Sequence, residues 1–393
     1  MTLRMAQKVM FKESWPIIYI ILAILTPLLH AEVEVRRITP PKLSANFLGQ
    51  KVLCHRPMRR GSPNMSVEQR YGKVIVSNYG HGDSCWALAP GCADYSNNLL
   101  INSRYSKDLK KDTPITIIGA GAIGLFVAYD LLIKGYSNIT IVAEVFDALT
   151  SHISGGLVAP VSIDNDAKVQ STIYKIGFKA YNFYKSIAEK KHSHIIEGAV
   201  VLPTYFENRD DSGLETYVGV VMEQAKDVIL DFCNGTTRKM IVYDDGIFVD
   251  TCKLMTAITD YLKKNKVKFV KKKISSFSQV RDKFIINCAG LGAKELSSDN
   301  KIVPVQGHLI MLKNQNPANL QYMISVYLNE GTTKSGQKVR RSFCIFPKYL
   351  PNSGANDFGM IGTTFIEGAT NLTPNKEEFD IVHKNAKEFF GIK

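Results

Sequence analysis

Short apolar runs alternate with amphipathic stretches through the middle of this chain, and the pattern predicts a parallel sheet with crossover helices. Residues 115–118 and 139–143 are apolar runs bounded by polar residues and glycines, which is typical of strands buried on both faces. An apolar helix over residues 125–134 is predicted between them. An alternating strand at 73–77 and an amphipathic helix at 169–190 extend the pattern. The predicted fold class is therefore α/β.

Two further elements flank this unit. A helix is predicted from Pro90 to Ile101, and a strand that starts at Phe284 runs into a turn of small residues ending at Gly292. The 393 residues suggest two domains, at about 100–200 residues per domain, or one large discontinuous unit.

The N-terminal region carries the longest apolar run, residues 17–29, with Arg4, Lys8 and Lys12 ahead of it. The run is shorter than the about 20 residues that a membrane span needs. A basic lead, a short apolar stretch and the small residue Ala31 are typical of a secretory signal, although Leu29 fits a cleavage site poorly. We expect an extracytoplasmic protein, secreted or periplasmic. A membrane anchor through 17–29 and a cytoplasmic protein with a hydrophobic N-terminal helix are the alternatives.

Composition narrows the possible partners. Lys plus Arg number 49 and Asp plus Glu 36, a net charge of +13, while 45% hydrophobic residues exclude a disordered chain. The positive charge is compatible with nucleic acid, a membrane surface or an anionic substrate. The basic stretch 263–273 lacks interleaved aromatics beyond Phe269, so we expect no nucleic-acid partner. Seven cysteines without a close CxxC pair predict no metal site.

A glycine-rich turn at 119–124 is the sharpest motif. Gly119, Gly121 and Gly124 follow a predicted strand directly, and Glu144 lies 20 residues after Gly124 at the end of the next strand. The first glycine permits the tight turn, the second lets backbone approach a pyrophosphate, and the third lets helix and strand pack closely. The acidic residue accepts ribose hydroxyls. This unit predicts a dinucleotide site but does not separate NAD from FAD.

Residues that follow the acidic position favour FAD. Gly155 and Gly156 suggest backbone packed against a flat ring system, and the turn ending at Gly292 suggests a second close approach to the cofactor. An NAD-dependent dehydrogenase is the weaker alternative.

Several segments resemble one family, the D-amino acid oxidase group of FAD-dependent oxidoreductases. The resemblance lies in residues 142–150, 155–160, 287–293, 305–312 and 358–368. It implies a Rossmann-type FAD-binding domain interleaved with a substrate domain built on a mostly antiparallel sheet with helices.

The order of the motifs departs from that family. In the family, an Arg-Pro-x-Arg segment and an Asn-Tyr-Gly-His-Gly-Gly loop lie near the C-terminus. In this chain, the residues that resemble them lie near the N-terminus, at 56–59 and 78–82. We therefore expect a circular permutation; chance matches in a truncated enzyme are the alternative. The implied segments are 1–31 as signal peptide or anchor, 32–50 as linker, 51–103 as the permuted end of the FAD domain, 113–160 as the FAD-binding core, 161–240 as the first part of the substrate domain, 241–303 as a return to the FAD domain and 304–393 as the second part of the substrate domain.

The resemblance also implies roles for individual residues. Arg56 would hold a substrate carboxylate, and the loop after His81 would face the flavin. The expected reaction is hydride transfer from a D-amino acid, or a related small amine acid, to FAD. The expected FAD contacts are Gly119, Gly121, Ala122, Ile123, Gly124, Glu144, Thr150, Ser151, Gly155, Gly156, Leu157, Ala289, Gly290, His81, Gly82, Asp83, Ser84, Cys85 and Trp86.

Three positions depart from the family pattern. Asp83 and Cys85 stand where the family has glycine, and Cys344 replaces the tyrosine that assists the arginine. Arg340 and Arg341 precede this cysteine and are candidate anion binders. The departures leave a second hypothesis open, a catalytically weakened FAD-fold protein that binds a ligand or partner.

Overall fold

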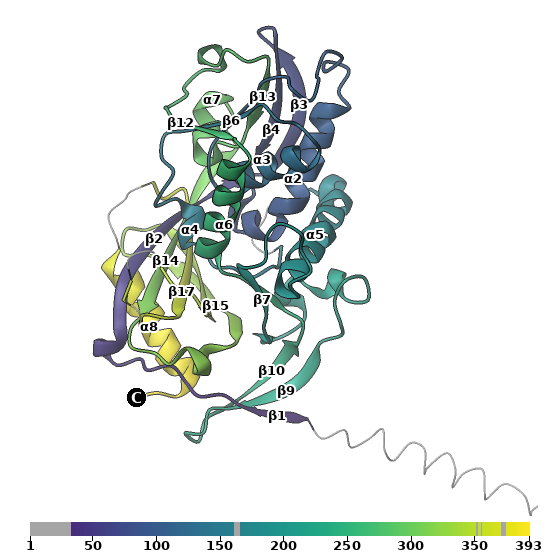
Figure 1. The fold of residues 1–393 in the computed structure, drawn as a ribbon. Helices are drawn as coiled ribbons and strands as arrows, with labels where there is room; N and C mark the ends of the chain where they lie inside the picture. The colour runs from purple at the N-terminus through teal and green to yellow at the C-terminus, as the bar shows by residue number, and fades with distance from the viewer. Residues whose placement is uncertain (1–32, 161–165, 351–352, 355, 371–374) are drawn as a thin grey trace, which may run out of the picture.

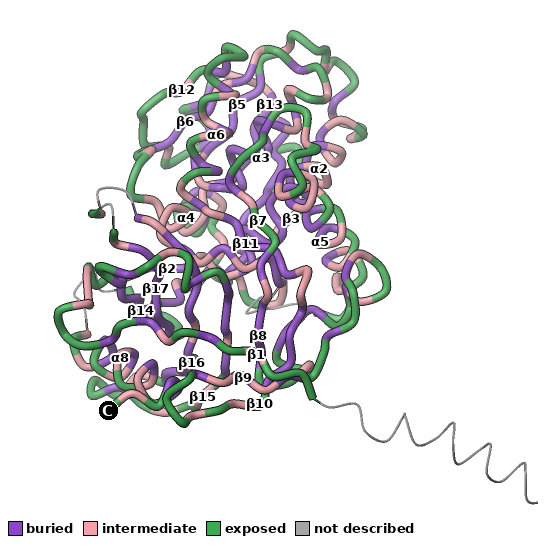
Figure 2. Tube along the Cα trace, turned by 60° about the horizontal axis from the view of Figure 1, so that its bottom comes forward, coloured by how far each residue is buried: buried purple, intermediate pink, exposed green. Residues whose placement is uncertain are grey.

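Two large sheets organise this computed structural model, which describes residues 33–160, 166–350, 353–354, 356–370 and 375–393. One sheet has six strands and the other has nine. In Figure 1 the first lies with helices in the upper part of the molecule and the second in the lower part. Buried residues follow the strands of both sheets, while exposed residues gather in the loops (Figure 2). Among the described residues no helix is both long and apolar enough to cross a membrane. The predicted signal or anchor at 1–31 lies outside them.

The six-stranded sheet is of the Rossmann type. Its strand order is β12-β6-β5-β13-β4-β3, with five parallel strands and an antiparallel β3 at the edge. The strands are β12 (Lys268–Lys271), β6 (Ile139–Ala143), β5 (Ile115–Ile118), β13 (Phe284–Asn287), β4 (Lys73–Tyr79) and β3 (Asn64–Arg70). All four residues of β5 are buried, as the short apolar run predicts for a central parallel strand.

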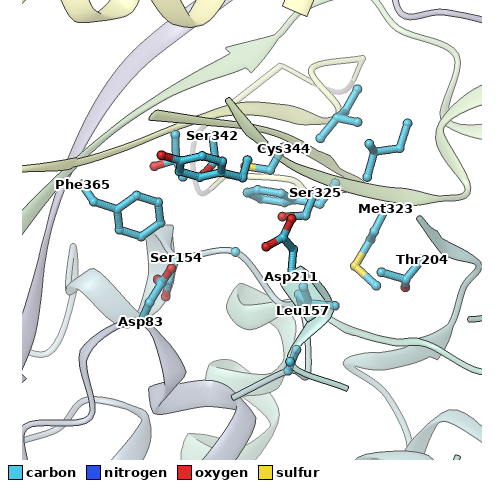
Figure 3. Close-up of a pocket in the computed structure, with 18 of the residues that line it drawn as sticks. Asp83, Ser154, Leu157, Thr204, Asp211, Met323, Ser325, Ser342, Cys344 and Phe365 are labelled. Atoms are coloured by element: carbon cyan, nitrogen blue, oxygen red, sulfur yellow. The ribbon is translucent and has the colours of Figure 1, made fainter. Parts of the chain in front are cut away.

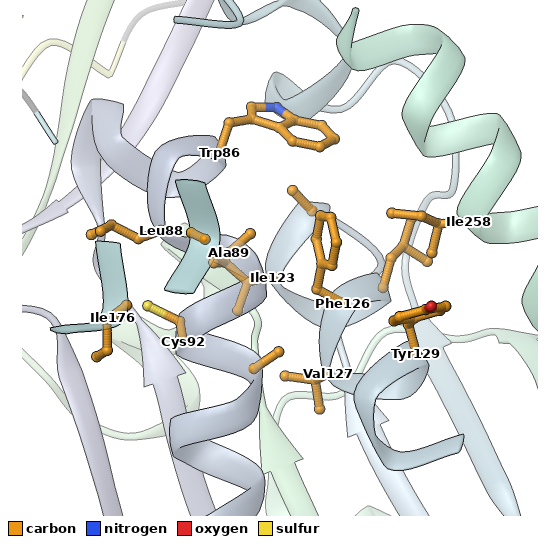
Figure 4. Packing of buried hydrophobic residues seen from close by; sticks show 14 of the residues in the cluster. Trp86, Leu88, Ala89, Cys92, Ile123, Phe126, Val127, Tyr129, Ile176 and Ile258 are labelled. Atoms are coloured by element: carbon orange, nitrogen blue, oxygen red, sulfur yellow. The ribbon is translucent and has the colours of Figure 1, made fainter. Parts of the chain in front are cut away.

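The helices of this part pack on the sheet or on one another around the largest core (Figure 4). They are α2 (Cys85–Ile101), α3 (Ala122–Ile133), α5 (Ala167–Ala188) and α6 (Thr251–Lys264). Two shorter helices are α4 (Thr150–Ile153) and α7 (Ala293–Leu296). Phe126 of α3 lies edge-on to Trp86 of α2 and to Tyr184 of α5. Aromatic contacts of this kind add to the stability that apolar burial already provides.

Helix α2 begins five residues before its predicted start at Pro90. A proline inside a helix has no N–H to donate, so the carbonyl four residues earlier loses its partner. That carbonyl belongs to Trp86, and the Tyr184 hydroxyl donates to it at 2.7 Å. A side chain from α5 therefore satisfies the group that Pro90 leaves unpaired.

The nine-stranded sheet has the order β1-β9-β10-β8-β15-β16-β17-β14-β2. Only the β1–β9 and β8–β15 pairs are parallel, so the predicted mostly antiparallel sheet is confirmed. The strands are β1 (Glu34–Arg37), β9 (Lys226–Asp231), β10 (Thr237–Tyr243), β8 (Thr204–Phe206), β15 (Met323–Thr332), β16 (Lys338–Phe346), β17 (Met360–Glu367), β14 (Ile302–Leu312) and β2 (Leu48–Arg59). Helix α8 (Lys376–Phe390) covers one face, where Phe379 and Phe390 enter a second core. A two-stranded sheet of β7 (Ala199–Val201) and β11 (Ile247–Val249) lies apart from both.

Two segment assignments require correction. Residues 34–37 of the predicted linker form β1, which pairs with β9, and Ile38 and Leu43 are buried in the α8 core. Residues 51–59, assigned to the FAD domain, form most of β2 and pair with β14 in the nine-stranded sheet. Val52, Cys54 and Arg56 alternate inward along β2. Because the third inward position is an arginine rather than an apolar residue, the alternation typical of a strand is not evident in the sequence.

Candidate active site

The glycine-rich turn has the close packing that its motif predicts. Gly119 follows β5 with φ of +107°, and a Cβ there would lie 2.3 Å from the Cys288 carbonyl oxygen. A Cβ at Gly124 would lie 2.1 Å from the Gly119 carbonyl oxygen. Larger residues at either position would force the turn, β13 and α3 apart. The N-terminus of α3 therefore lies close against the carboxyl end of β5.

A cavity of about 560 Å³ opens at the carboxyl ends of the parallel strands, and we call it the strand-end cavity. A crevice at this edge is where open parallel sheets bind nucleotides. Of the predicted FAD contacts it gathers Gly119, Gly121, Ala122, Ile123, Glu144, Thr150, Ser151, Ala289, Gly290, His81 and Cys85. The N–H of Ala122 donates to the Ser151 hydroxyl at 3.0 Å, so α4 adjoins the start of α3.

His81 is among the residues that line this cavity, and one of its ring nitrogens, Nε2, is buried without a hydrogen-bond partner among the described residues. The residue is 1% exposed. Burial lowers the pKa of His81 to about 4, so the imidazole is neutral at physiological pH. A buried orphaned nitrogen at a cavity wall is suited to a ligand that supplies its partner.

Lysines that sequence reasoning assigned to an exposed basic stretch also line the strand-end cavity. Lys272 and Lys273 follow β12, and the Lys273 ammonium lies 3.6 Å from a carboxylate oxygen of Glu144. The sheet topology could have predicted their position, because β12 runs parallel to β6 and the two strands end at the same edge of the sheet. Both side chains of the Lys273–Glu144 pair are more than half exposed, so we assign it little energy.

A second cavity, of about 420 Å³, lies between the nine-stranded sheet and the segment that follows α4 (Figure 3). We call it the inter-sheet cavity. The predicted residues that line it are Arg56, Asp83, Gly155, Leu157 and Cys344. An outer cavity of about 740 Å³ shares four residues with it, Arg56, Asp83, Arg340 and Phe365. Those four residues therefore form the partition between the two spaces.

Arg56 is buried in this partition and paired with an acid of its own chain. It is 5% exposed, and its Nε donates to Asp83 Oδ1 at 2.7 Å. The two other guanidinium nitrogens donate to the Thr364 carbonyl at 3.1 Å and to the Thr363 hydroxyl at 3.0 Å. Burial opposes the charged form most strongly, but the charge and the hydrogen bond of Asp83, with smaller contributions from neighbouring groups, together raise the pKa of Arg56. The arginine is therefore a fixed cation.

The ring of Phe365 is held by two arginines. The guanidinium carbon of Arg56 lies 4.5 Å from the ring centroid, and that of Arg340 lies 4.3 Å from it. Cations this close to an aromatic ring centroid are attracted by its electrons. Phe365 thus helps to place both positive charges at the partition.

The predicted role of Arg341 is wrong. Neighbouring residues of a strand point to opposite faces, so Arg340 faces the cavities while Arg341 faces α8. There Arg341 donates to both carboxylate oxygens of Glu378, at 2.9 and 2.6 Å, and the Glu378 side chain is 1% exposed. Arg341 therefore forms a buried ion pair with Glu378 and lines none of the three cavities.

Cys344 does line the inter-sheet cavity, but as a neutral thiol. Burial, reinforced by the charge of Asp83, raises the pKa of Cys344 to about 12. The nearby Cys54 thiol is also buried, and its pKa is raised. Neither thiol is suited to act as a base or nucleophile.

Four predicted contacts line none of these cavities in the described part of the chain: Gly124, Gly156, Ser84 and Trp86. Trp86 lies in the core instead, and its indole N–H donates to the Ser151 carbonyl at 3.0 Å, which steadies α4. A Cβ on Gly156 would lie 1.8 Å from the Val249 carbonyl oxygen, so this glycine serves packing. Gly82 lines the outer cavity only. The described residues contain no cluster of three potential metal ligands.

The residues present fit a dinucleotide that continues toward the inter-sheet cavity. The glycine turn leaves bare backbone, His81 offers an unpaired nitrogen, and α4 lines the strand-end cavity with Thr150 and Ser151. Ser154, directly after α4, lines the inter-sheet cavity. The fold and site thus define a dinucleotide-dependent α/β enzyme with a separate substrate sheet.

Comparison with known proteins identifies the family. The family model DAO, FAD dependent oxidoreductase, matches residues 114–392. The chain belongs to this family of FAD-dependent oxidoreductases, and its cofactor is FAD.

Solved structures share the fold. Glycine oxidase from Bacillus cereus ATCC 14579 has 15% identity and a TM-score of 0.50, with 70% of this chain and 79% of that chain covered. Glycine oxidase from Geobacillus kaustophilus has 14% identity and a TM-score of 0.50, with 70% and 76% covered.

Proposed function

We propose that this protein oxidises the carbon–nitrogen bond of a small amine acid, by resemblance a D-amino acid. The buried Arg56 at the wall of the inter-sheet cavity carries the proposal. A guanidinium has five N–H donors, and Asp83, Thr363 and Thr364 engage three of them. Two donors remain to hold a carboxylate beside the segment that contains Gly155.

The protein's part in this reaction is binding and orientation. FAD, when bound, supplies the hydride acceptor. Arg56 and the Phe365 ring orient the carboxylate end, and the partition separates the inter-sheet cavity from the outer one. Cys344 and Cys54 keep their protons, so the cavity offers no thiolate base. The neutral His81, whose Nε2 has no partner among the described residues, would give or take one hydrogen bond with the cofactor.

Absorption spectroscopy tests this function. The purified protein, loaded with FAD, should be yellow, and a mixture of D-amino acids added without oxygen should bleach it. Arg56→Ala should raise the KM steeply, because truncating a partner in a charge-assisted bond costs about 2–5 kcal/mol. An FAD-loaded protein that no D-amino acid or small amine acid bleaches would sink the proposal.

The pairing of Arg56 with Asp83 favours a second candidate function, an FAD-containing binding protein with weakened catalysis. An internal carboxylate competes with a substrate carboxylate for the same guanidinium. This candidate predicts that FAD is retained, that small carboxylates bind weakly and that no amine bleaches the flavin. Asp83→Gly, which restores the family residue, should then allow bleaching.

We also propose that the chain is circularly permuted. Support comes from β4, which lies between β13 and β3, and from β2, which pairs with β14 at the edge of the nine-stranded sheet, because both N-terminal strands are integrated into the two sheets. A reordered gene that places residues 48–102 after residue 393 should yield a protein with unchanged FAD affinity. Loss of FAD binding in a soluble reordered protein would contradict the permutation.

The N-terminal 31 residues are proposed to direct export. The basic lead and the apolar run support this proposal. Fractionation and N-terminal sequencing of the full-length protein test it; a cytoplasmic protein with an intact N-terminus would contradict it.

A further inference from the structure

Lys348 is a buried cation that the proposed reaction does not use. It follows β16, it is 0% exposed, and its Nζ donates to the Ser154 carbonyl at 2.7 Å and to the Thr251 hydroxyl. Among the described residues no carboxylate forms an ion pair with it. The carboxylate of Asp250 acts to raise the pKa of Lys348 by electrostatic attraction without pairing with it. Asp250 caps α6, and its carboxylate lies 3.7 Å from the Lys253 ammonium.

Burial of an ammonium without a counter-ion is expensive, because a hydroxyl and a carbonyl replace water and no opposite charge compensates. A methionine or leucine would fill the same space at lower cost. We therefore expect the environment of the Lys348 ammonium to reveal a role that requires its positive charge.

That environment is the wall of the inter-sheet cavity. Ser154, whose carbonyl Lys348 holds, lines the cavity together with Gly155 and Leu157 (Figure 3). Neighbouring residues hold this wall in place: a Cβ on Gly155 would lie 3.3 Å from the ring of Phe346, which also lines the cavity, and the Gly156 carbonyl accepts from the Val249 N–H at 2.7 Å. A single stretch of backbone thus stands between the lysine and the cavity.

The same stretch holds Gly155, the glycine of the predicted flavin contacts here that lines the cavity. We propose that Lys348 is a positioning residue for FAD, which fixes the 154–157 wall and places behind it a positive charge that favours the reduced cofactor. Hydride transfer moves two electrons and one proton from the amine carbon to FAD. One unit of negative charge therefore passes from the substrate to the cofactor. A fixed cation one backbone layer away stabilises that gained charge.

The charge of Lys348 is adjustable. Burial lowers the pKa of Lys348 to about 8, and of its neighbours Cys252, Asp250 and Cys54 each opposes this shift only when it is ionised. Burial raises the pKa values of both thiols, so they carry no charge near neutrality. His152 of α4 also faces this region, and burial and the charge of Lys348 lower its pKa. Asp250 is then the remaining ionised neighbour, and Lys253 already pairs with it.

The midpoint potential of the FAD-loaded protein tests the proposal. Lys348→Met keeps the side-chain length and removes the charge. We expect it to shift the equilibrium toward oxidised FAD at least tenfold, which for a two-electron couple is about 30 mV. Lys348→Arg should retain a potential near that of the wild type. Because the potential is measured with a dye and without substrate, it does not depend on the proposed amine oxidation.

Lys253→Met is the matched control. It removes a lysine charge from the same region, but the Lys253 side chain is 58% exposed and water screens it. Its potential should equal that of the wild type. An unchanged potential in Lys348→Met, or equal shifts in both variants, overturns the proposal.

A second variant covers the case in which Lys348→Met does not fold. Thr251→Val removes one acceptor of the ammonium and leaves the lysine in place. It should lower the potential in the same direction, because the charged amine loses a hydrogen bond. A folded Thr251→Val protein with an unaltered potential would also refute the role of Lys348.

Discussion

Asp83 Oδ1 lies 2.7 Å from Nε of Arg56, so the buried guanidinium at the inter-sheet cavity already binds a carboxylate of its own chain. Asp83 is 23% exposed on its side chain and Arg56 only 6%. The pair places a competitor beside the donors that a substrate carboxylate needs. It also sets a stability cost for any change at Asp83, since Arg56 would remain buried without its partner.

Asp83→Asn separates these two effects. Leaving the buried guanidinium unpaired should lower the free energy of unfolding by about 1–3 kcal/mol, less than the about 3–5 kcal/mol of a fully buried pair because Asp83 is partly exposed. A small carboxylate such as acetate should restore part of that loss by replacing Asp83. Denaturant titration with and without acetate measures both. Stabilisation of the wild type by acetate to the same degree would contradict competition at Arg56.

Neighbouring arginines of β16 should behave differently. Arg341→Ala leaves Glu378 buried and unpaired, so we expect a loss of about 3–5 kcal/mol in unfolding free energy with little change in KM. Arg340→Ala should change stability less and KM more, because Arg340 lines both cavities. Urea denaturation and steady-state kinetics of the two variants provide the comparison. A raised KM in a folded Arg341→Ala protein would return that residue to the active site.

Lys348 predicts a pH dependence of stability. Its pKa is lowered from 10.5 to about 8, so between these values the unfolded chain binds more protons than the native one. Its contribution to stability therefore rises with pH across this window, by at most about 3 kcal/mol, and stays constant below it. The difference between wild type and Lys348→Met, measured by denaturation across this pH range, isolates the effect. Parallel stability curves for the two proteins would show that Lys348 has an ordinary pKa.

Gly124→Ala should abolish tight FAD binding. The added Cβ would lie 2.1 Å from the Gly119 carbonyl oxygen, which forces the turn away from α3. We expect affinity for FAD to fall at least tenfold, equivalent to about 1.4 kcal/mol. Gly336→Ala is the control, because Gly336 lies in the turn between β15 and β16, lines none of the three cavities and has no atom within 4 Å of an added Cβ. Titration of apoprotein with FAD measures both, and equal losses would refute a specific role for Gly124.

Local patterns predicted the nucleotide half of the site. The turn at Gly119 and the acid at Glu144 follow buried strands directly, and parallel strands bring their carboxyl ends to one edge. The position of each residue therefore follows from short-range geometry. The same logic extended to β12 would have placed Lys273 at this edge as well.

The substrate half resisted prediction because its contacts join distant segments. Arg340 and Arg341 are adjacent in sequence, and only the face that α8 covers decides which of them reaches the cavity. Asp83 reaches Arg56 across two sheets, since one follows β4 and the other lies in β2. Pairing of this kind depends on how the sheets pack, which no local pattern records.

The sequence by itself determined the α/β class, the dinucleotide turn and the family resemblance, because each rests on residues close together along the chain. Only the tertiary structure decided that Arg56 is already paired, that Arg341 is a structural residue and that Lys348 holds the Ser154 carbonyl from 194 residues away. The free energy of a buried charge depends on the groups that surround it in space, and those groups come from elements that the chain order does not place together.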